Sequence, residues 1–346
     1  MKLDLTVPSA LEYFASLVGS DQDLALFEAA LSLGQDEYPE LDLQASMAEV
    51  DQLVARLQRR LADDASALQR VRVLNQFFFT DLGFAGNVNN YYDPDNSFVS
   101  QLLRTRRGIP ISLAVLWMEL AQALKLDAQG VSFPGHFMVK VNLPMGQAVI
   151  DPMSGRSLSK EELSEMLEPF RRRSGLVDDF EAPLGLYLQA ASPREILARM
   201  LRNLKEIYRS QQDWPRLLAV QERLVVLLPE SWPEYRDRGL VHAELGNSRQ
   251  ALSDLELYLE HASHMVDTEQ IVDQVKILRI QTGISAPGKR SPGGWGINLS
   301  EPPLAHRHLG RQSCPRCRQF RRWRAMSQLW LLRWQRPPPR PCRCRC

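Results

Sequence analysis

The chain has 346 residues, of which 44% are hydrophobic, so it is long enough for two domains with buried cores. Its net charge of +1 combines two unlike parts, because residues 287–346 hold fourteen Lys and Arg but a single acidic residue. The first 286 residues hold 28 basic and 40 acidic residues, and this acidic balance argues against a nucleic-acid-binding surface as the main function.

All five cysteines lie between residues 314 and 346, so no disulfide framework supports the first 313 residues. The N-terminus lacks a basic segment followed by an uninterrupted apolar run. No stretch approaches the length of a membrane span. We therefore expect a cytoplasmic protein without a membrane partner.

Apolar residues at three- and four-residue spacing predict several helices in the N-terminal part of the chain. Their expected bounds are 9–17, 21–33, 43–61 and 67–82. The Asn, Asp and Pro content of residues 86–97 favours an ordered loop. Residues 110–124 are apolar nearly all round, which predicts a central buried helix with Pro110 in its first position.

Two strands joined by a four-residue turn are predicted next, at residues 136–142 and 147–151. When the last residue of the first strand faces the first residue of the second, His136 and Asp151 become diagonal neighbours on one face of the hairpin. Such neighbours are roughly 7–8 Å apart at the backbone, within reach of a hydrogen bond between ring and carboxylate. A helix at 159–168 and an irregular stretch to residue 190 follow.

Residues 192–263 contain two segments that align at a spacing of 34, the period of the helix–turn–helix tetratricopeptide repeat. The aligned pairs are Leu217 with Ala251, Lys205 with Gly239, and Leu224 with Tyr258. Residues 267–280 predict the capping helix that a short repeat array needs.

The last part of the chain, 286–346, is rich in Arg, Pro and Cys and lacks apolar periodicity, so we expect disorder. The favoured interpretation is the product of a shifted reading frame in GC-rich DNA. One alternative is a basic arm for nucleic acid or an anionic membrane. Another is a zinc site at Cys314 and Cys317, although the terminal cysteines lack the paired spacing of a typical zinc site.

Ser112, His136 and Asp151 follow one another on a helix and two strands, an order that suits a catalytic triad. A hydrogen bond from Asp151 would fix the tautomer of His136 and stabilise its imidazolium form. Ser112 lies in the first turn of the buried helix, where unpaired N–H groups can stabilise developing negative charge. Each residue also has an ordinary structural interpretation: helix capping for Ser112, a satisfied structural histidine, and a turn at Asp151.

Four sequence blocks carry a resemblance to a known family. They are Asn-Tyr-Tyr-Asp-Pro at 90–94, Arg-Arg-Gly-Ile-Pro-Ile-Ser-Leu at 106–113, Pro-Gly-His-Phe at 134–137 and Asp-Pro at 151–152. Through these blocks, residues 31–280 resemble the bacterial SirB-type (YchA-like) proteins, which join a transglutaminase-like core to tetratricopeptide repeats. The resemblance implies a papain-like α+β fold. Transglutaminase-like enzymes use Cys, His and Asp for acyl transfer or amide hydrolysis, and the last two correspond to His136 and Asp151.

The cysteine of that triad has no counterpart: Ser112 is nearest to the expected position, and Pro110 is an alternative alignment. A serine hydroxyl is far less acidic than a thiol, whose free pKa is about 8.5, so it depends on a well-placed base. The favoured hypothesis is a protein-binding or regulatory protein on a scaffold that lacks the usual cysteine. The alternative is an acyl-transfer or amide-hydrolysing enzyme that uses Ser112, His136 and Asp151.

Two further groups of residues are candidates for binding a protein or peptide. Side chains of the polar loop could line the cleft, or else form internal hydrogen bonds in a rigid turn: Asn89, Tyr91, Tyr92 and Asp93. Cations on the first helix of each repeat could bind an acidic peptide in the repeat groove, or pair with the acidic first domain: Arg199, Arg202, Arg209 and Arg236. Packing of the two repeats against the core is the favoured arrangement.

The sequence thus predicts an α+β protein in which a helix-rich transglutaminase-like core precedes an all-α tetratricopeptide module. The expected domains are an N-terminal helical section (1–85), the core (86–190), two repeats plus a capping helix (191–285) and the tail (286–346). We expect a protein or peptide partner, no nucleic-acid partner, and neither a cofactor nor a metal. The oligomeric state is open.

Overall fold

A computed structural model describes residues 8–174, 183–261 and 268–283. The predicted tail, with its alternative interpretations as a basic arm or a zinc site, lies outside these residues. Within the described ranges, no helix is long and apolar enough to cross a membrane.

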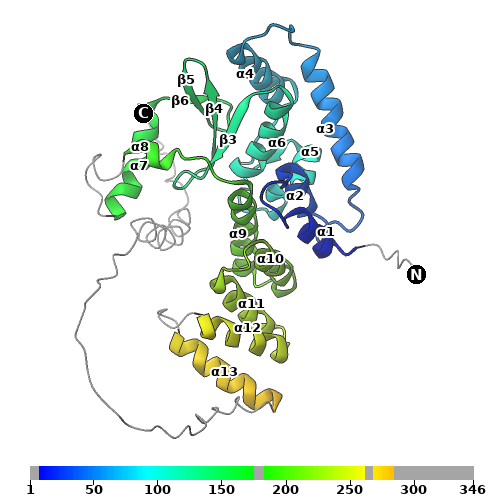
Figure 1. The fold of residues 1–346 in the computed structure, drawn as a ribbon, viewed down its shortest axis with the longest axis vertical. Coiled ribbons are helices and arrows are strands. Elements are labelled where there is room, and N and C mark those ends of the chain that lie inside the picture. Colours follow the sequence, from blue (N-terminus) through cyan, green and yellow to red (C-terminus); the bar gives the residue numbers. More distant parts are fainter. Residues whose placement is uncertain (1–7, 175–182, 262–267, 284–346) are drawn as a thin grey trace, which may run out of the picture.

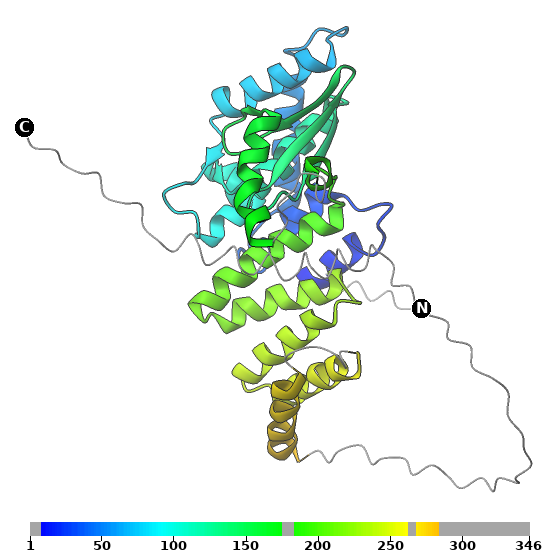
Figure 2. The same cartoon turned by 90° about the vertical axis from the view of Figure 1, so that its left-hand side faces the viewer.

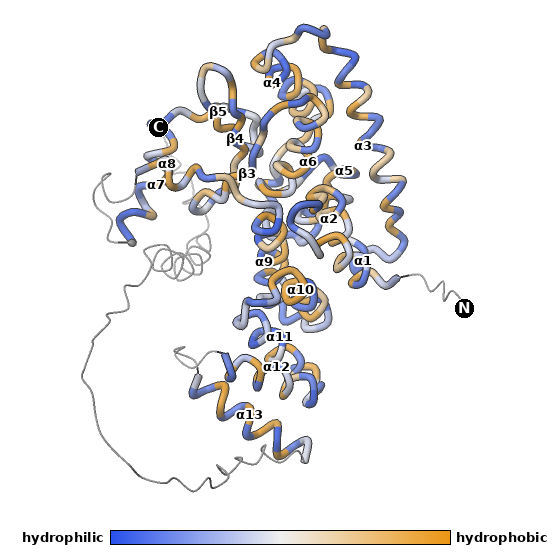
Figure 3. The backbone as a smooth tube through the Cα atoms, viewed as in Figure 1, coloured by the Kyte–Doolittle hydropathy of each residue, from blue (hydrophilic) through white to orange (hydrophobic). Residues whose placement is uncertain are grey.

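The N-terminal section is helical, as predicted. It contains α1 (Ala10–Leu17), α2 (Leu26–Ser32), α3 (Leu43–Gln58), α4 (Ala67–Asn75) and a π-helical turn, η1 (Gln76–Asp81). Helix α2 begins later than expected, after a turn in which the Ser20 hydroxyl accepts a hydrogen bond from the Gln22 N–H. Hydrophobic and hydrophilic residues alternate along α3 (Figure 3), since one side packs on the core while the other faces solvent.

Helix α6 (Pro110–Ala123) lies at the centre of the core and confirms the predicted buried helix. Eleven of its fourteen residues are buried, and Pro110 occupies the first turn. It lies between the sheet and the helices α2 to α5 (Figure 1), of which α5 (Val99–Thr105) was not predicted.

The main sheet has four antiparallel strands in the order β3-β4-β5-β6. Their bounds are β3 (Asp127–Val131), β4 (Met138–Leu143), β5 (Gly146–Ile150) and β6 (Ser157–Leu158). The predicted hairpin register is confirmed, because Asn142 pairs with Gln147. Val139 and Val141 of β4 face the α6 side, whereas Met138 packs against α7 (Lys160–Ser174), so the sheet is covered on both faces.

A short parallel pair, β1 (Ala85–Gly86) and β2 (Arg107–Gly108), brings two distant segments together. Between these strands lie the polar loop, a 3-10 turn η2 (Pro94–Ser97) and α5. The pairing therefore holds the polar loop beside the start of α6.

The repeat module extends from the core as a stack of helices (Figures 1 and 2). After the short α8 (Leu184–Tyr187) come α9 (Pro193–Gln211), α10 (Trp214–Leu227), α11 (Trp232–Glu244), α12 (Ser248–His261) and α13 (Thr268–Thr282). Helix α9 packs on α2 and α10 packs on α1, so the module lies against the core as favoured above.

The N-terminal helices, the sheet and the first helices of the repeat module share one hydrophobic core. One continuous cluster of buried residues runs from Phe14 in α1 to Val241 in α11. A second cluster joins α12 and α13. The division into domains at residues 85, 190 and 285 stays a prediction.

Helix α9 approaches β3 closely at Gly130. The carbonyl O of Gly130 accepts a hydrogen bond from the Ala191 N–H at 2.8 Å. A Cβ at Gly130 would lie 2.7 Å from Phe137 Cζ and 2.9 Å from Ile196 Cδ1 of α9. Only glycine fits this approach without displacing one of the two side chains.

We predict that Gly130→Val lowers the free energy of unfolding by about 1–3 kcal/mol, the usual cost of overpacking, as measured by urea denaturation. The control is Gly185→Val, because a Cβ at this exposed glycine meets no atom of the described residues within 4 Å. A Gly130→Val protein as stable as the Gly185→Val protein would contradict the close docking of α9.

Candidate functional site

His136 is placed by a tight turn between β3 and β4. In the segment Phe133-Pro134-Gly135-His136, the His136 N–H donates to the Phe133 carbonyl O at 3.1 Å. Gly135 has a φ of 73°, which suits the third position of a type II turn after proline. The turn sets the imidazole beside the end of β5.

The His136 ring and the Asp151 carboxylate are in direct contact. His136 Nε2 lies 2.8 Å from Asp151 Oδ1. Both residues lie outside the observed strands, since β4 begins at Met138 and β5 ends at Ile150, in contrast to the predicted bounds. Continued beyond the strand ends, the hairpin register still makes them diagonal neighbours. The side chains are 20% and 21% exposed, and because Nε2 is occupied, Nδ1 is the ring nitrogen left for a substrate or partner.

The Asp151 carboxylate also organises the turn that follows β5. Its Oδ1 accepts from the Met153 N–H at 3.0 Å, and its Oδ2 accepts from the Ser154 hydroxyl at 2.8 Å. Burial works to raise the pKa of Asp151, but the hydrogen bonds from His136, Met153 and Ser154 outweigh it and hold the pKa below its usual value. One side chain therefore serves both the turn and the pairing with histidine.

Ser112 is fully buried, and its hydroxyl is directed to the backbone. It donates a hydrogen bond to the Asn96 carbonyl O at 2.6 Å, and it accepts a hydrogen bond from the Ile109 N–H at 3.2 Å. A hydroxyl has a single proton to donate, so a base near Ser112 would compete with this short bond. Among the described residues, Ser112 and His136 form no hydrogen bond with each other. The structure thus brings His136 and Asp151 together without Ser112, and the catalytic role of the three stays a prediction.

Asn96, which the sequence did not single out, organises the polar loop. Only 3% exposed, it donates to the Asn90 and Tyr91 carbonyls and accepts from the Asn87 side chain at 3.0 Å. Asp93 accepts from the Asn90 side chain at 2.7 Å and caps η2. These bonds match the rigid-turn alternative for the loop.

Three of the four predicted cleft residues nevertheless remain exposed. Tyr91 and Tyr92 are 43% and 48% exposed, and their rings meet edge to face with centroids 5.5 Å apart. Asn89 is also exposed. Because tyrosine combines a large apolar ring with a hydrogen-bonding hydroxyl, this loop is suited to protein contact.

Three of the four predicted groove arginines form ion pairs inside the repeat module. Arg202 pairs with Glu234 at 2.9 Å, and Arg209 pairs with Asp237 at 3.4 Å. Arg236 also pairs with Asp237, at 2.5 Å. Carboxylates from α11 therefore partly neutralise the positive groove that was expected for an acidic peptide.

Arg199, the fourth of these arginines, contacts the His136 turn. Its Nη2 donates to the His136 carbonyl O at 3.0 Å, and its Nη1 lies 3.5 Å from the Phe133 carbonyl O. The guanidinium also stacks over the Phe137 ring, 5.5 Å from the centroid. This contact joins α9 to the candidate site.

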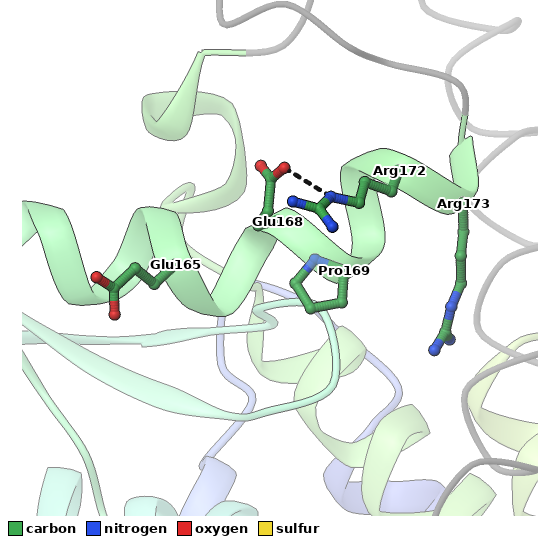
Figure 4. A pocket seen from close by; sticks show the side chains of 5 residues that line it. All are labelled: Glu165, Glu168, Pro169, Arg172 and Arg173. Carbon is green, nitrogen blue, oxygen red and sulfur yellow. Dashed lines mark hydrogen bonds and ion pairs between the residues drawn. The ribbon is translucent and has the colours of Figure 1, made fainter.

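Two surface hollows lie apart from these residues. One, on α7, contains the Glu168–Arg172 ion pair at 2.9 Å (Figure 4). The other contains Arg60 and Arg72. Neither hollow is lined by a predicted site residue. The His136 site is therefore identified by the contact between His136 and Asp151, and not by a surface hollow. In the described ranges, no group of three or more His, Cys, Asp and Glu is arranged to hold a metal ion.

The fold and the His–Asp pair define the class of protein. A model of the transglutaminase-like superfamily matches residues 44–202, and a tetratricopeptide-repeat model matches residues 204–276. The chain is therefore a helix-rich α+β protein with a transglutaminase-like domain followed by a tetratricopeptide region.

Sequence identity to known proteins identifies the particular family to which the chain belongs. The UPF0162 protein of Xylella fastidiosa strain Temecula1 is 38% identical over 250 residues, which cover 71% of this chain and 88% of the relative. UPF0162 protein PA3419 of Pseudomonas aeruginosa is 32% identical over 232 residues, 67% of this chain and 83% of the relative. UPF0162 protein YchA of Escherichia coli K12 is 28% identical over 244 residues, 70% of this chain and 84% of the relative. This chain belongs to the UPF0162 family, which confirms the YchA-like resemblance.

We predict that Asp151→Asn lowers the free energy of unfolding near pH 7 by about 1–2 kcal/mol, because hydrogen bonds to a charged acceptor are lost. The folded pKa of Asp151 lies below its unfolded value of 3.8, so its stabilisation is present above pH 3.8 and is lost as pH falls through the folded pKa. Urea denaturation from pH 7 to pH 3 should therefore show the difference between wild type and variant shrinking toward acid. A difference that stays constant over this range would contradict the account of the carboxylate.

Proposed function

We propose that this chain is a protein-binding or regulatory protein, in which the tetratricopeptide module and the His136 side of the core take up a partner. The observation that carries the proposal is the buried Ser112 hydroxyl, which donates to the Asn96 carbonyl at 2.6 Å. The start of α6 thus offers neither a cysteine nor a free serine for His136 to activate. On this proposal the transglutaminase-like domain is a pseudoenzyme.

The surroundings of the site support binding by protein or peptide. Tetratricopeptide repeats are a protein-interaction architecture, whose stacked helices present an extended surface. Tyr91 and Tyr92 expose aromatic rings of the kind enriched at protein interfaces. The acidic balance of residues 1–286 favours protein over nucleic acid, and the lack of cysteines in residues 1–313 favours the cytoplasm.

The alternative is an acyl-transfer or amide-hydrolysing enzyme with Ser112 as nucleophile, His136 as base and Asp151 as orienting residue. The observation that favours it is the His136–Asp151 hydrogen bond at 2.8 Å, which is the arrangement that a triad needs. It requires the Ser112 side chain to leave the Asn96 carbonyl and reach His136.

Two measurements on the same proteins distinguish the proposed binding protein from the alternative enzyme. Proteins captured by the full chain from lysate of the producing cells are identified by mass spectrometry, purified and titrated against wild type and variants. We expect His136→Ala to weaken partner binding at least tenfold, about 1.4 kcal/mol, because a central contact is truncated. The control is Arg59→Gln, a change at an exposed residue at the end of α3, outside the repeat module and the His136 side of the core, which should leave the affinity unchanged.

In the second arm, the same proteins are incubated with a peptide-amide library with and without an added amine. We expect no hydrolysis or amine transfer that depends on His136. Turnover that disappears in both His136→Ala and Ser112→Ala, with both variants folded by circular dichroism, would overturn the proposal and establish the enzyme.

A further inference from the structure

Helix α9 carries a row of cations, and one of them differs from the rest. Arg194, Arg202 and Lys205 each pair with a carboxylate, at distances of 2.5, 2.9 and 2.7 Å. Arg199 pairs with no carboxylate among residues 8–174, 183–261 and 268–283. Its polar contacts in these ranges are the neutral carbonyls of Phe133 and His136.

Arg199 has a charge and N–H donors that could bind a further group. Arg199 is half-buried, and burial lowers the pKa of its guanidinium to about 10, so it stays charged near neutral pH. A guanidinium has five N–H donors, and the part of the chain that the structure describes supplies hydrogen bonds to two carbonyls only. Because a desolvated charge is costly without a counter-charge, a carboxylate that reached Arg199 would be strongly favoured.

Partly exposed side chains of the candidate site lie around Arg199, which is itself partly exposed. The Tyr91 hydroxyl lies near enough for Arg199 to lower its pKa, although burial of that hydroxyl has the larger effect and raises it. Tyr91 is 43% exposed, and the His136 side chain is 20% exposed. The two side chains nearest to Arg199 in this argument are thus both partly accessible from solvent.

We propose that Arg199 binds a carboxylate of a peptide partner at the junction of α9 with the His136 turn, beside Tyr91. This inference rests on the proposed binding function and names the chemistry of the partner: an acidic side chain or a C-terminal carboxylate. The Asp151 carboxylate, bonded to the His136 ring, has a lowered pKa and is ionised near neutral pH, and its negative charge disfavours a doubly charged phosphate more than a singly charged carboxylate. Arg202, Arg209 and Arg236 contribute little, because α11 already supplies their carboxylates.

Three short peptides serve as probes for the full chain. Acetyl-Gly-Gly-Gly-Gly has a free C-terminal carboxylate, acetyl-Gly-Glu-Gly-amide has a side-chain carboxylate, and acetyl-Gly-Gly-Gly-Gly-amide has neither. Binding is followed by NMR through the Nε–H signal of Arg199 in arginine-labelled protein, assigned with Arg199→Lys, and through line broadening of the peptide. We expect a saturable shift of the Arg199 signal with one or both carboxylate peptides and none with the neutral amide.

Variants give the quantitative test. Arg199→Gln should weaken binding of the carboxylate peptide at least tenfold, about 1.4 kcal/mol. Arg199→Lys keeps the charge but loses the planar fork, so its affinity should lie between those of wild type and Arg199→Gln. Arg249→Gln makes the same charge change at an exposed site and should leave the affinity unchanged.

The proposal is overturned if neither carboxylate peptide shifts the Arg199 signal, or if Arg249→Gln weakens binding as much as Arg199→Gln. If either outcome occurs while partner binding still depends on His136, the carboxylate site is disproved and the proposed binding function is not. Turnover dependent on His136 and Ser112 removes the proposed function, whatever the peptides do at Arg199.

Discussion

The burial of α6 is the constraint on which the rest of the structure depends. A helix that is apolar on nearly every side must be covered on every side. The sheet covers it through β3 and β4, α2 to α5 cover most of the remainder, and α9 also contacts it. The N-terminal helices are therefore part of what allows the transglutaminase-like core to fold, and α9 joins the same hydrophobic cluster. Core and first repeat are one packed body because they share this helix.

The same burial determines the surroundings of Ser112. The first turn of a helix has unpaired N–H groups, and where water is excluded these and their neighbours must be satisfied from within the protein. Ser112 meets this need by bonding to the Asn96 carbonyl and the Ile109 N–H. The His136–Asp151 pair depends instead on a turn and a hairpin register. The His136–Asp151 pair can thus form while the Ser112 hydroxyl is engaged in holding the helix.

The features predicted from the sequence are those encoded locally. The buried helix, the hairpin register and the repeat period each follow from a continuous pattern of residues. Strand β3 was not predicted, because Asp127, Gln129 and Gly130 are poor strand formers. Its pairing with β4 stabilises the strand in spite of this low propensity. The partners of Ser112 and Arg199 lie sixteen and 63 residues away, Asn96 in a loop and His136 in a turn. Such contacts are set by tertiary packing, and no local sequence pattern indicates them.

The central claim is that the Ser112 hydroxyl supports the structure and does not act as a nucleophile. A fluorophosphonate tests this without knowledge of a substrate, because it forms a covalent bond with a serine activated by a neighbouring base and releases fluoride. The measurement is the intact mass of the full chain after exposure, followed by peptide mapping of any adduct. The account predicts no modification of Ser112 in the wild-type protein. An adduct on Ser112 that forms in the wild type and is absent from folded His136→Ala would contradict it.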